Sequence, residues 1–518
     1  MSQADLAIPD VDVTSFVLEQ AAERGEKPAL IDGPSGRTLT YAELGEQIAA
    51  MRGGLAARGF GRGDALAIYL PNTPEYAVAF HAAASAGGRA TTANPLYTAR
   101  ELGHQLHDSG ARFLLTAPAL LDTALAAAEE AGVEEVFVAG EDPDQATPLA
   151  ELLAAEPVPV AEIDAAADLA VLPYSSGTTG LPKGVMLSHR NLVANLIQAG
   201  EPLALTEDDA LVGCLPFFHI YGMTVIMNLG LRHGATIVTM PRFDLAEFLA
   251  LIERHRVTVG FVVPPIALAL AKHPAIDDAD LSSLRFLMSG AAPLGPELVE
   301  AVEARLECMV AQGYGMTETS PVTHTIPMDP ERNRIGTVGP PLRGTECRLV
   351  DPESGEGVGP GERGEVWIRG PQVMQGYLNN EEATAATIDA DGWLHTGDIG
   401  IADEDEYCAI VDRLKELIKY KGFQVPPAEL EALLLGYPAV ADAAVVGVPD
   451  EEAGELPKAF VVVAPGEELD HEELIAWVAE RVAPQKKIRL IEEIEAVPKS
   501  ASGKILRREL TAREHSPG

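Results

Sequence analysis

Tyr174-Ser-Ser-Gly-Thr-Thr-Gly-Leu-Pro-Lys-Gly-Val185 places four Ser/Thr hydroxyls, three glycines and one lysine within twelve residues. Glycines let consecutive backbone N–H groups converge on an anion, and the hydroxyls add donors. Pro182-Lys183-Gly184 breaks the Gly-x4-Gly-Lys-Ser/Thr spacing of a Walker A loop. A plain surface turn is the alternative, because such clusters are common in turns. The density of the cluster, with an apolar strand before it and a helix expected after it, favours a loop that binds the phosphates of a nucleotide.

Length and charge narrow the classes of protein. A chain of 518 residues is expected to form two to four structural units. Its formal charge is −40, which disfavours binding to nucleic acid or to an anionic membrane. Any phosphate-bearing substrate therefore needs a locally positive site. The four cysteines show no CxxC pair, which argues against a zinc site and against a dense disulfide framework.

Apolar strand patterns alternate with helical spacing through most of the chain. This alternation predicts α/β architecture, with sheets covered by helices on both faces. The expected strands include 29–31, 37–41, 65–70, 113–115, 136–138, 235–239 and 257–263, and the expected helices 75–86, 119–128, 245–255 and 266–271.

Beyond about residue 340 the pattern changes to a smaller β unit, with strands at 347–350 and 364–369. Gly359-Pro-Gly-Glu-Arg-Gly364 formally matches GxGxxG, but no strand leads directly into it and no helix follows, so we interpret it as a hairpin turn. From about 411–416 onward a separate α+β unit is expected. Its elements are helix 427–435, strands 441–448, 459–463 and 488–490, and helix 471–482.

Five segments, in this order, resemble the adenylate-forming superfamily of acyl-CoA synthetases, aryl-acid ligases, adenylation domains and luciferases. The resemblance covers nearly the whole chain. It implies an N-terminal AMP-binding domain (1–411), a hinge (412–416) and a small mobile C-terminal domain (417–518). The segments are the loop that ends at Lys183, Gly313-Tyr-Gly-Met-Thr-Glu-Thr319, Gly392-Trp-Leu-His-Thr-Gly-Asp398, Val411-Asp-Arg-Leu-Lys-Glu-Leu-Ile-Lys-Tyr-Lys-Gly-Phe423 and Pro498-Lys-Ser-Ala-Ser-Gly-Lys-Ile-Leu-Arg-Arg508.

The resemblance implies a role for each polar residue of these segments. Tyr314 would stack on adenine, Asp398 and Arg413 would reach the ribose, and Glu318 would help to hold Mg²⁺, for which a carboxylate is a suitable ligand. Thr178 is the second expected metal-site residue. The full set expected to bind ATP or AMP is Ser175, Ser176, Gly177, Thr178, Thr179, Lys183, Gln312, Gly313, Tyr314, Thr317, Asp398, Arg413, Lys419 and Lys504.

Lys504 is the expected principal catalyst. Attack of a carboxylate on the α-phosphate brings two anions together, so a cation directed at the developing charge is the main need. Lys499 is interpreted as a surface lysine without such a role. The resemblance places the hinge at Lys415, so that one orientation brings Lys504 to ATP and the other brings the region of Lys421 and Gly422 to the thiol. The remaining expected catalytic residues are Lys419, Gln424 and His219.

The finer resemblance is to 4-coumarate–CoA ligases and bacterial cinnamate-activating relatives. It rests on Pro216-Phe-Phe-His-Ile-Tyr-Gly222, Met288-Ser-Gly-Ala-Ala-Pro-Leu-Gly295 and the segments that follow Thr319 and Leu414. Small residues are expected to leave a flat slot for a planar acid. Without the resemblance, His219 would be interpreted as a core histidine. The expected acyl pocket consists of His219, Tyr221, Val225, Ala291, Ala292, Gly315, Pro321 and Val322.

Two departures make the expected pocket less polar. Val225 and Met288 stand where many plant enzymes carry a polar residue and a lysine. A pocket that selects a hydroxyl needs a hydrogen-bond partner for it. Unsubstituted cinnamate or a medium-chain fatty acid therefore stays open beside 4-coumarate.

The expected activity is ATP-dependent acid–CoA ligation through an acyl-AMP, with release of AMP and pyrophosphate. ATP, Mg²⁺, CoA and a small carboxylic acid are the expected ligands, and Arg242, Lys421 and Gly422 the expected CoA contacts. Alternatives are a fatty acyl-CoA synthetase, an adenylation enzyme that loads a carrier protein, and a degenerate binding protein. The sequence shows neither a signal peptide nor a membrane span, so we expect a cytoplasmic protein. The expected oligomeric state is a monomer or a homodimer.

Overall fold

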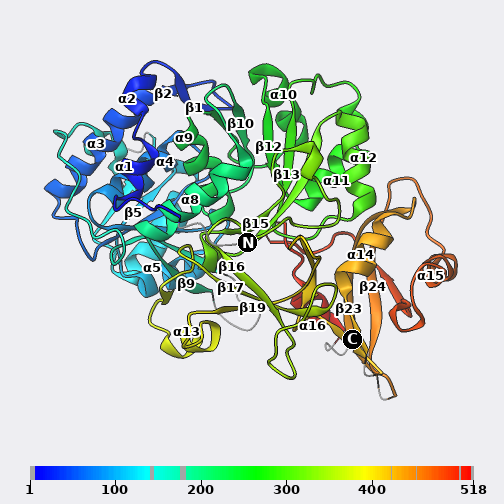
Figure 1. Ribbon diagram of the computed structural model, residues 1–518. Helices are drawn as coiled ribbons and strands as arrows, with labels where there is room; N and C mark the ends of the chain where they lie inside the picture. Colours follow the sequence, from blue (N-terminus) through cyan, green and yellow to red (C-terminus); the bar gives the residue numbers. More distant parts are fainter. Residues whose placement is uncertain are drawn as a thin grey trace.

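A computed structural model describes residues 6–140, 145–175, 182–421, 423–450, 452–500 and 503–514. Ser176, Gly177, Thr178, Thr179 and Gly422, which the sequence assigned to binding sites, lie outside these residues. The described chain forms two eight-stranded sheets, a four-stranded sheet and a five-stranded sheet. Figure 1 shows the first two side by side above the small sheet, with the last strands and helices to one side. The expected α/β class, with its small β unit and α+β C-terminal part, is confirmed.

The sheet that leads into the loop at 176–181 has its strands in the order β18-β9-β8-β4-β3-β5-β6-β7. All five residues of β3 are buried, as its continuous apolar run predicts. Helices α3 (Tyr41–Ala57), α4 (Pro74–Ser85), α5 (Ala99–Ser109) and α6 (Leu121–Ala131) accompany it. The strands are β3 (Ala65–Tyr69), β4 (Arg89–Thr92), β5 (Ala111–Thr116), β6 (Glu135–Val138), β7 (Thr147–Pro148), β8 (Leu169–Ser175), β9 (Lys183–Ser188) and β18 (Gly376–Tyr377).

The expected helix directly after the loop is wrong. Strand β9 follows instead and pairs antiparallel with β8, with Ser175 opposite Lys183. Helix α8 (His189–Leu203) begins only after β9, where the Ser188 side chain caps it by accepting from the N–H of Asn191. The loop therefore connects the two strands of a hairpin, β8 and β9, and the pairing of Ser175 with Lys183 fixes the positions of its two ends.

The second sheet has the order β15-β14-β13-β12-β10-β11-β1-β2 and is parallel from β1 to β14. One hydrophobic core joins it to the first sheet, since Leu30 and Ile68 belong to the same buried cluster. Its strands are β1 (Pro28–Asp32), β2 (Thr38–Thr40), β10 (Ala210–Gly213), β11 (Thr236–Thr239), β12 (Val259–Val262), β13 (Phe286–Ser289), β14 (Met309–Gly315) and β15 (Val322–Thr325). Its accompanying helices include α9 (Leu229–His233), α10 (Leu245–His255), α11 (Pro264–Lys272) and α12 (Pro296–Leu306).

The four-stranded sheet is an antiparallel meander of β16 (Glu346–Val350), β17 (Arg363–Arg369), β19 (Leu394–Ala402) and β20 (Cys408–Arg413). Residues 359–362 of the GxGxxG segment lie in the connection between the antiparallel strands β16 and β17, and Arg363 and Gly364 begin β17, which confirms the hairpin interpretation. Strand β20 ends at the segment that the sequence assigned to the hinge.

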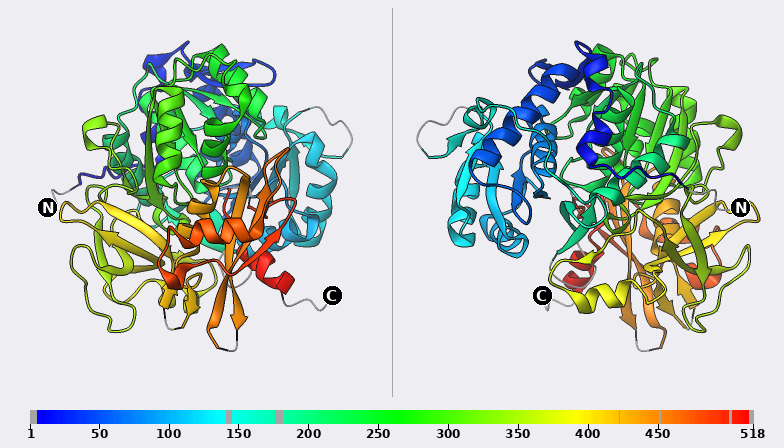
Figure 2. Two further views of the ribbon diagram at one scale, coloured as in Figure 1. Left: turned by 90° about the vertical axis from the view of Figure 1, so that its right-hand side faces the viewer. Right: turned by 60° about the vertical axis from the view of Figure 1, so that its left-hand side comes forward.

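The C-terminal part has a hydrophobic core of its own, built around residues such as Leu430, Val445 and Leu474. Figure 2 shows it packed beneath the two large sheets. Helix α15 and strand β25 differ by a few residues from the expected 471–482 and 488–490. The elements are β21 (Ile418–Tyr420), β22 (Phe423–Val425), α14 (Pro427–Leu435), β23 (Val440–Asp450), β24 (Gly454–Val463), α15 (His471–Ala479), β25 (Leu490–Glu493) and α16 (Arg507–Glu514). The domain limits at 411 and 417 stay a prediction.

Candidate active site

A cavity of about 210 Å³ lies where the second sheet, the four-stranded sheet and the C-terminal part meet. The carboxyl end of β14 and the segment after β13 form one wall, and β20 and the segment that carries Lys504 form others. Open parallel sheets bind ligands beyond the carboxyl ends of their strands. The residues of the cavity wall that the sequence assigned to binding or catalysis are Ala291, Ala292, Gln312, Gly313, Tyr314, Gly315, Asp398, Arg413 and Lys504.

Tyr314, Asp398 and Arg413 form a connected group in this wall. The Tyr314 hydroxyl donates to Oδ2 of Asp398 at 2.6 Å, and Nε of Arg413 lies 3.3 Å from Oδ1. Burial raises the pKa of the Asp398 carboxyl, whereas Arg413 and the Tyr314 hydroxyl oppose that rise. The pKa of Tyr314 is raised well above its usual value by burial and by Asp398. The geometry presents a buried carboxylate that can accept hydrogen bonds from a polar ligand in the cavity.

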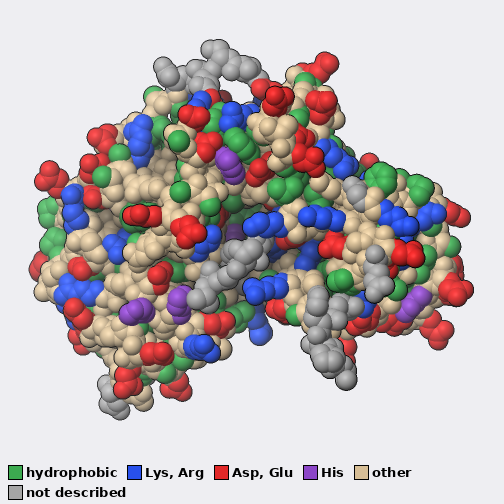
Figure 3. All heavy atoms as spheres, turned by 90° about the horizontal axis from the view of Figure 1, so that it is seen from below, with side chains coloured by type: hydrophobic (Ala, Val, Ile, Leu, Met, Phe, Trp, Pro, Cys, Tyr) green, Lys and Arg blue, Asp and Glu red, His purple; other side chains and the backbone are tan. Residues whose placement is uncertain are grey.

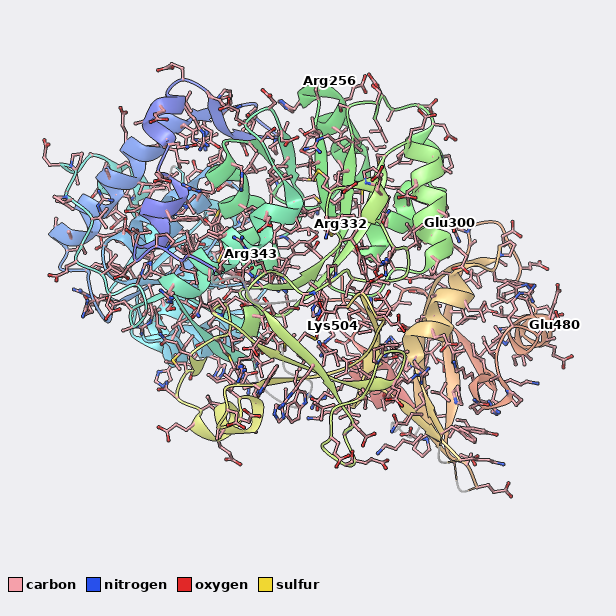
Figure 4. All side chains as sticks on the ribbon, in the orientation of Figure 1. Arg256, Glu300, Arg332, Arg343, Glu480 and Lys504 are labelled. Atoms are coloured by element: carbon pink, nitrogen blue, oxygen red, sulfur yellow. The ribbon has the colours of Figure 1, made fainter. Side chains whose placement is uncertain are left out.

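Lys504 reaches this group from the C-terminal part, and Figure 4 places it at the centre of the molecule. Burial lowers the pKa of its ammonium to about 8; Arg413 acts in the same direction, and Glu416 and Asp398 oppose it. The preceding Gly503 has φ +80°, and a Cβ there would lie 3.1 Å from Cγ2 of Val263. Glycine is therefore required for the Lys504 segment to approach the second sheet this closely.

Lys499 has a different environment. Its Nζ lies 2.6 Å from Oδ2 of Asp442, a residue of β23 in the same part of the chain. This ion pair supports the interpretation of Lys499 as structural, although Lys499 also touches the cavity wall.

The base of the 176–181 loop is joined to Glu318. Ser175 donates to Oε1 of Glu318 at 3.0 Å, and the hydroxyl of Tyr377 donates to the same oxygen at 2.8 Å. Nζ of Lys183 lies 4.1 Å from the centre of the Tyr377 ring, a cation–π contact. Sequence reasoning missed Tyr377, because it lies in a two-residue strand far from the motifs, and no spacing marks it.

The residues around Glu318 suit a magnesium ion held together with a nucleotide. Mg²⁺ is usually bound by one or two carboxylates together with substrate phosphates. Glu318 is 6% exposed and lies beside the start of the loop. Thr317 is half-buried in the same 3₁₀ turn, Thr317–Thr319. Within the described residues no three His, Cys, Asp or Glu side chains gather to hold a metal.

The expected acyl-pocket residues are only partly brought together at the cavity. Ala291, Ala292 and Gly315 line it, whereas Tyr221 lies behind Met288 and donates its hydroxyl to the Met288 carbonyl at 3.1 Å. Val225 is 1% exposed and belongs to the large core. The other expected members, His219, Pro321 and Val322, are not part of the cavity wall.

Gly315 also has a structural role that the sequence did not indicate. A Cβ at Gly315 would lie 2.0 Å from the carbonyl oxygen of Pro321, which accepts from the N–H of Met316. The glycine is therefore needed for a close approach of two backbone segments, besides lining the cavity. His219 resembles the core histidine of the alternative interpretation: its Nδ1 accepts from the N–H of Tyr221, and burial lowers its pKa to about 4.

Several of the other residues expected to serve in nucleotide binding, catalysis, CoA binding or the hinge lie away from the cavity. Lys419 and Gln424 face each other on the β21–β22 hairpin and are exposed, as are Lys421 and Lys415. Arg242 is exposed on the segment after β11. The structure thus brings Lys504, but not Lys419 or Gln424, to Asp398.

The surface around this junction carries positive charge on an acidic protein. Figure 3 shows Lys and Arg side chains gathered over the middle of the face seen from below, with Asp and Glu more frequent around the rim. Such a local concentration is what an anionic substrate requires on a chain of charge −40.

A large α/β region and a small unit that meet around a buried carboxylate and a lysine are the arrangement of a nucleotide-binding enzyme, and this chain belongs to the AMP-binding enzyme family. The family model matches residues 17–378, and that of the AMP-binding enzyme C-terminal domain matches 429–504. The chain is 46% identical to 4-coumarate–CoA ligase 5 of Oryza sativa subsp. japonica, over 98% of this chain and 96% of that protein.

Solved structures agree. The anthranilate CoA ligase AuaEII in complex with anthranoyl-AMP superposes with a TM-score of 0.92 at 26% identity, covering 99% of each chain. ATP-bound MatB from Rhodopseudomonas palustris superposes with a TM-score of 0.89 at 30% identity, covering 98% of this chain and 99% of that one. The apo form of MatB superposes with a TM-score of 0.79 at 31% identity, with the same coverage of both chains. This chain thus superposes better on the ATP-bound form of MatB. No helix in the described part of the chain is long and apolar enough to cross a membrane.

Proposed function

We propose that this protein is an ATP-dependent acid–CoA ligase that works through an acyl-AMP. The observation that carries the proposal is the position of Lys504, which reaches the wall formed by Tyr314, Asp398 and Arg413 from another part of the chain. The full-length similarity to 4-coumarate–CoA ligases supports the same activity. ATP and CoA are then the cosubstrates, and Mg²⁺ is the metal ion.

In the first half-reaction, a carboxylate oxygen of the acid attacks the α-phosphorus of ATP, and the bond to the bridging oxygen breaks to release pyrophosphate. The Lys504 ammonium stabilises the negative charge that develops there, in a site where burial makes such a charge interaction stronger. Asp398 accepts hydrogen bonds from the nucleotide, and Arg413 favours the ionised form of that carboxylate against the rise in its pKa that burial causes. Mg²⁺ near Glu318 would neutralise the phosphates when bound.

In the second half-reaction, the thiol sulfur of CoA attacks the acyl carbonyl carbon, and AMP leaves with the oxygen that bridged it to the acyl group. Lys421 and Arg242 are proposed to bind CoA in this step, and Gln424 is proposed as a catalytic residue, whereas Lys419 stays proposed as a catalytic and nucleotide-binding residue. Because they lie on exposed segments away from the cavity, this step requires the C-terminal part to turn about Lys415. Such domain rotations commonly separate steps of one reaction.

We propose an aryl propenoic acid of the 4-coumarate or cinnamate type as the acid. Met288 is 3% exposed, and its sulfur lies 3.8 Å from the Thr325 hydroxyl. Neither Met288 nor Val225 has a polar side chain that could pair with a ring hydroxyl of the acid. Cinnamate is therefore expected to be used at least as well as 4-coumarate. A medium-chain fatty acid, or transfer to a carrier protein in place of CoA, would be the alternatives.

The test is an assay of the purified protein with ATP, Mg²⁺, CoA and a panel of cinnamates, benzoates and medium-chain fatty acids. We expect AMP and pyrophosphate as products, and a thioester only when CoA is present. Release of ADP and phosphate would contradict the proposal, and efficient loading of a carrier protein with negligible CoA turnover would favour the second alternative. A cytoplasmic location stays a prediction that cell fractionation would test.

A further inference from the structure

Helix α14 of the C-terminal part begins without a side-chain cap of its own. Its N-cap residue is Pro426, which has no acceptor to offer the first free N–H groups. Asp412 supplies one: its Oδ2 accepts from the N–H of Ala428 at 2.9 Å. Asp412 lies on β20, before the proposed hinge at Lys415, and is 5% exposed. The cap therefore joins two residues, Asp412 and Ala428, that lie on opposite sides of Lys415 in the chain.

The other end of α14 is held from the same side of the molecule. Nζ of Lys272, the last residue of α11, donates to the carbonyl of Leu435, the last residue of α14, at 2.8 Å. Between the two ends, a Cβ placed on Gly295 would lie 3.3 Å from Cβ of Ala432. The N-terminal region thus holds α14 by an acidic side chain at its N-terminus and a basic one at its C-terminus, as the helix dipole favours.

Further charged groups surround Asp412. Arg507 forms ion pairs with Glu416 and Glu431, the latter at 2.6 Å. Arg507 also favours the ionised form of Asp412, whereas burial and Glu416 raise the pKa of that carboxyl. Arg507 follows Lys504 by three residues. The segment that carries Lys504 is therefore connected to α14 through Arg507 and Glu431.

We propose that Asp412 and Lys272 are positioning residues that clamp α14 and thereby hold Lys504 in the cavity for the first half-reaction. All of α14 follows Lys415 in the chain, and both clamp residues precede it. A rotation about Lys415 that withdraws Lys504 also carries Ala428 and Leu435 away from the clamp. The clamp therefore stabilises only the orientation that forms acyl-AMP. This inference rests on the two half-reactions proposed above.

The first experiment measures the two half-reactions separately. Asp412→Ala is expected to lower acid-dependent ATP–pyrophosphate exchange about fivefold, the typical effect of losing one helix cap. Lys272→Ala is expected to lower it about two- to threefold, as for an exposed charge at a helix end. Both variants should form thioester from supplied acyl-AMP at least as fast as the unmodified enzyme. Asp412→Asn keeps an acceptor oxygen and should recover most of the exchange rate.

Asp470→Ala is the matched control. Asp470 caps α15 by accepting from the N–H groups of Glu472 and Glu473, entirely within the C-terminal part. Its loss weakens that part without touching the clamp, so the ratio of the two half-reactions should not change. Equal losses of both half-reactions in Asp412→Ala and Lys272→Ala would overturn the proposal.

A second measurement is independent of activity. Spin labels on Glu300→Cys and Glu480→Cys, two exposed positions labelled in Figure 4 on opposite sides of the hinge, report the orientation of the C-terminal part by pulsed electron resonance. Asp412→Ala should broaden or shift their distance distribution, and an unchanged distribution would overturn the clamp. A further outcome is that the unmodified protein shows no ATP–pyrophosphate exchange with any acid while Asp412→Ala still changes the distance between the two spin labels. In that case the proposed function would fail, but the clamp on α14 would stand.

Discussion

At the scale of single residues, the site depends on neighbouring charges that offset the cost of burying the Asp398 carboxylate and the Lys504 ammonium. Each is a charged group in a buried setting, which is costly unless partners compensate. Asp398 has Arg413 and the hydroxyl of Tyr314 as partners. Lys504 has Asp398 and Glu416 nearby, but the adjacent Arg413 opposes its charge. The bound triphosphate would supply the anion that Lys504 needs.

Replacing Lys504 should separate the half-reactions. Lys504→Ala is expected to lower acid-dependent pyrophosphate exchange by about 10²–10³, the usual loss when one stabilising charge is removed from a transition state. Thioester formation from supplied acyl-AMP should change little. Lys499→Ala, which removes a lysine of the same segment that pairs with Asp442, is the control and should retain most exchange. Equal loss of both half-reactions in Lys504→Ala would refute this division of roles.

The pH profile of the first half-reaction should report Lys504. Because burial lowers the pKa of its ammonium to about 8, the free enzyme loses this charge as the pH rises through 8. The ratio kcat/KM for ATP reflects groups of the free enzyme, so in pyrophosphate exchange it should fall about tenfold per pH unit above pH 8. Lys504→Arg keeps its charge and should lack this decline, even if it is slower. A flat profile of the unmodified enzyme up to pH 10 would contradict the prediction.

The sequence alone was sufficient to identify candidate site residues that belong to local motifs. Asp398, Arg413 and Lys504 each stand in a recognisable segment, and the fold brings them to one cavity. Tyr377 could not be found this way, because its contact with Glu318 joins residues far apart in the chain. The exposure of Lys419 could not be foreseen either, since it depends on the orientation of the C-terminal part, which local sequence does not determine.

At the scale of elements, the periodic apolar segments were predictable and the segments around close backbone contacts were not. Helices α10 and α14 have the expected limits: α10 follows its N-cap Asp244, and α14 begins at Pro427 and ends before Gly436. A helix was expected next to the loop, but strand β9 (Lys183–Ser188) stands between the loop and α8. Its pairing with β8 is a tertiary preference that overrides local spacing. The need for glycine at Gly315 likewise appears only when β14 and Pro321 are placed together.

Gly315→Ala should therefore destabilise the protein. The added Cβ would meet the Pro321 carbonyl oxygen, a backbone atom that is itself hydrogen-bonded to Met316. Overpacking against such a contact costs about 1–3 kcal/mol or more. Gly45→Ala is the matched control, because no atom lies within 4 Å of the new Cβ in helix α3; it should stabilise by up to ~1 kcal/mol. Thermal unfolding of both variants measures this, and equal melting temperatures would contradict the clash.

At the scale of the whole molecule, the large region and the C-terminal part have separate hydrophobic cores, which explains how one chain can serve two half-reactions. The large core joins both eight-stranded sheets, and a smaller one lies within the C-terminal part around Leu430 and Leu474. Each part can keep its packing while their relative orientation changes, because each core lies within its own part; the Asp412 cap and the Lys272 contact, both polar, are among the contacts between them. The chain length indicated several units, but the interface between them follows from the fold.

Acid should destabilise the large region through its buried histidines. His81, His189 and His324 are 0% exposed, and burial lowers the pKa of the first two to about 4 and of the third to about 3. Their folded pKa values lie below that of an unfolded histidine, near 6.5. The stability that they contribute is therefore present above pH 6.5 and is lost as the pH falls toward 4. Linkage predicts that unfolding takes up about three protons from these groups near pH 5, a loss of roughly 2 kcal/mol from each relative to pH 8.

The dependence of the unfolding free energy on pH, measured by urea titration between pH 5 and 8, tests this expectation. His81→Gln should reduce the proton uptake near pH 5 by about one, whatever its effect on stability at pH 8. His104→Gln changes an exposed histidine of α5 and should leave the uptake unaltered. The expectation would be wrong if both variants kept the uptake of the unmodified chain, because the buried imidazole of His81 would then titrate as it does in the unfolded state.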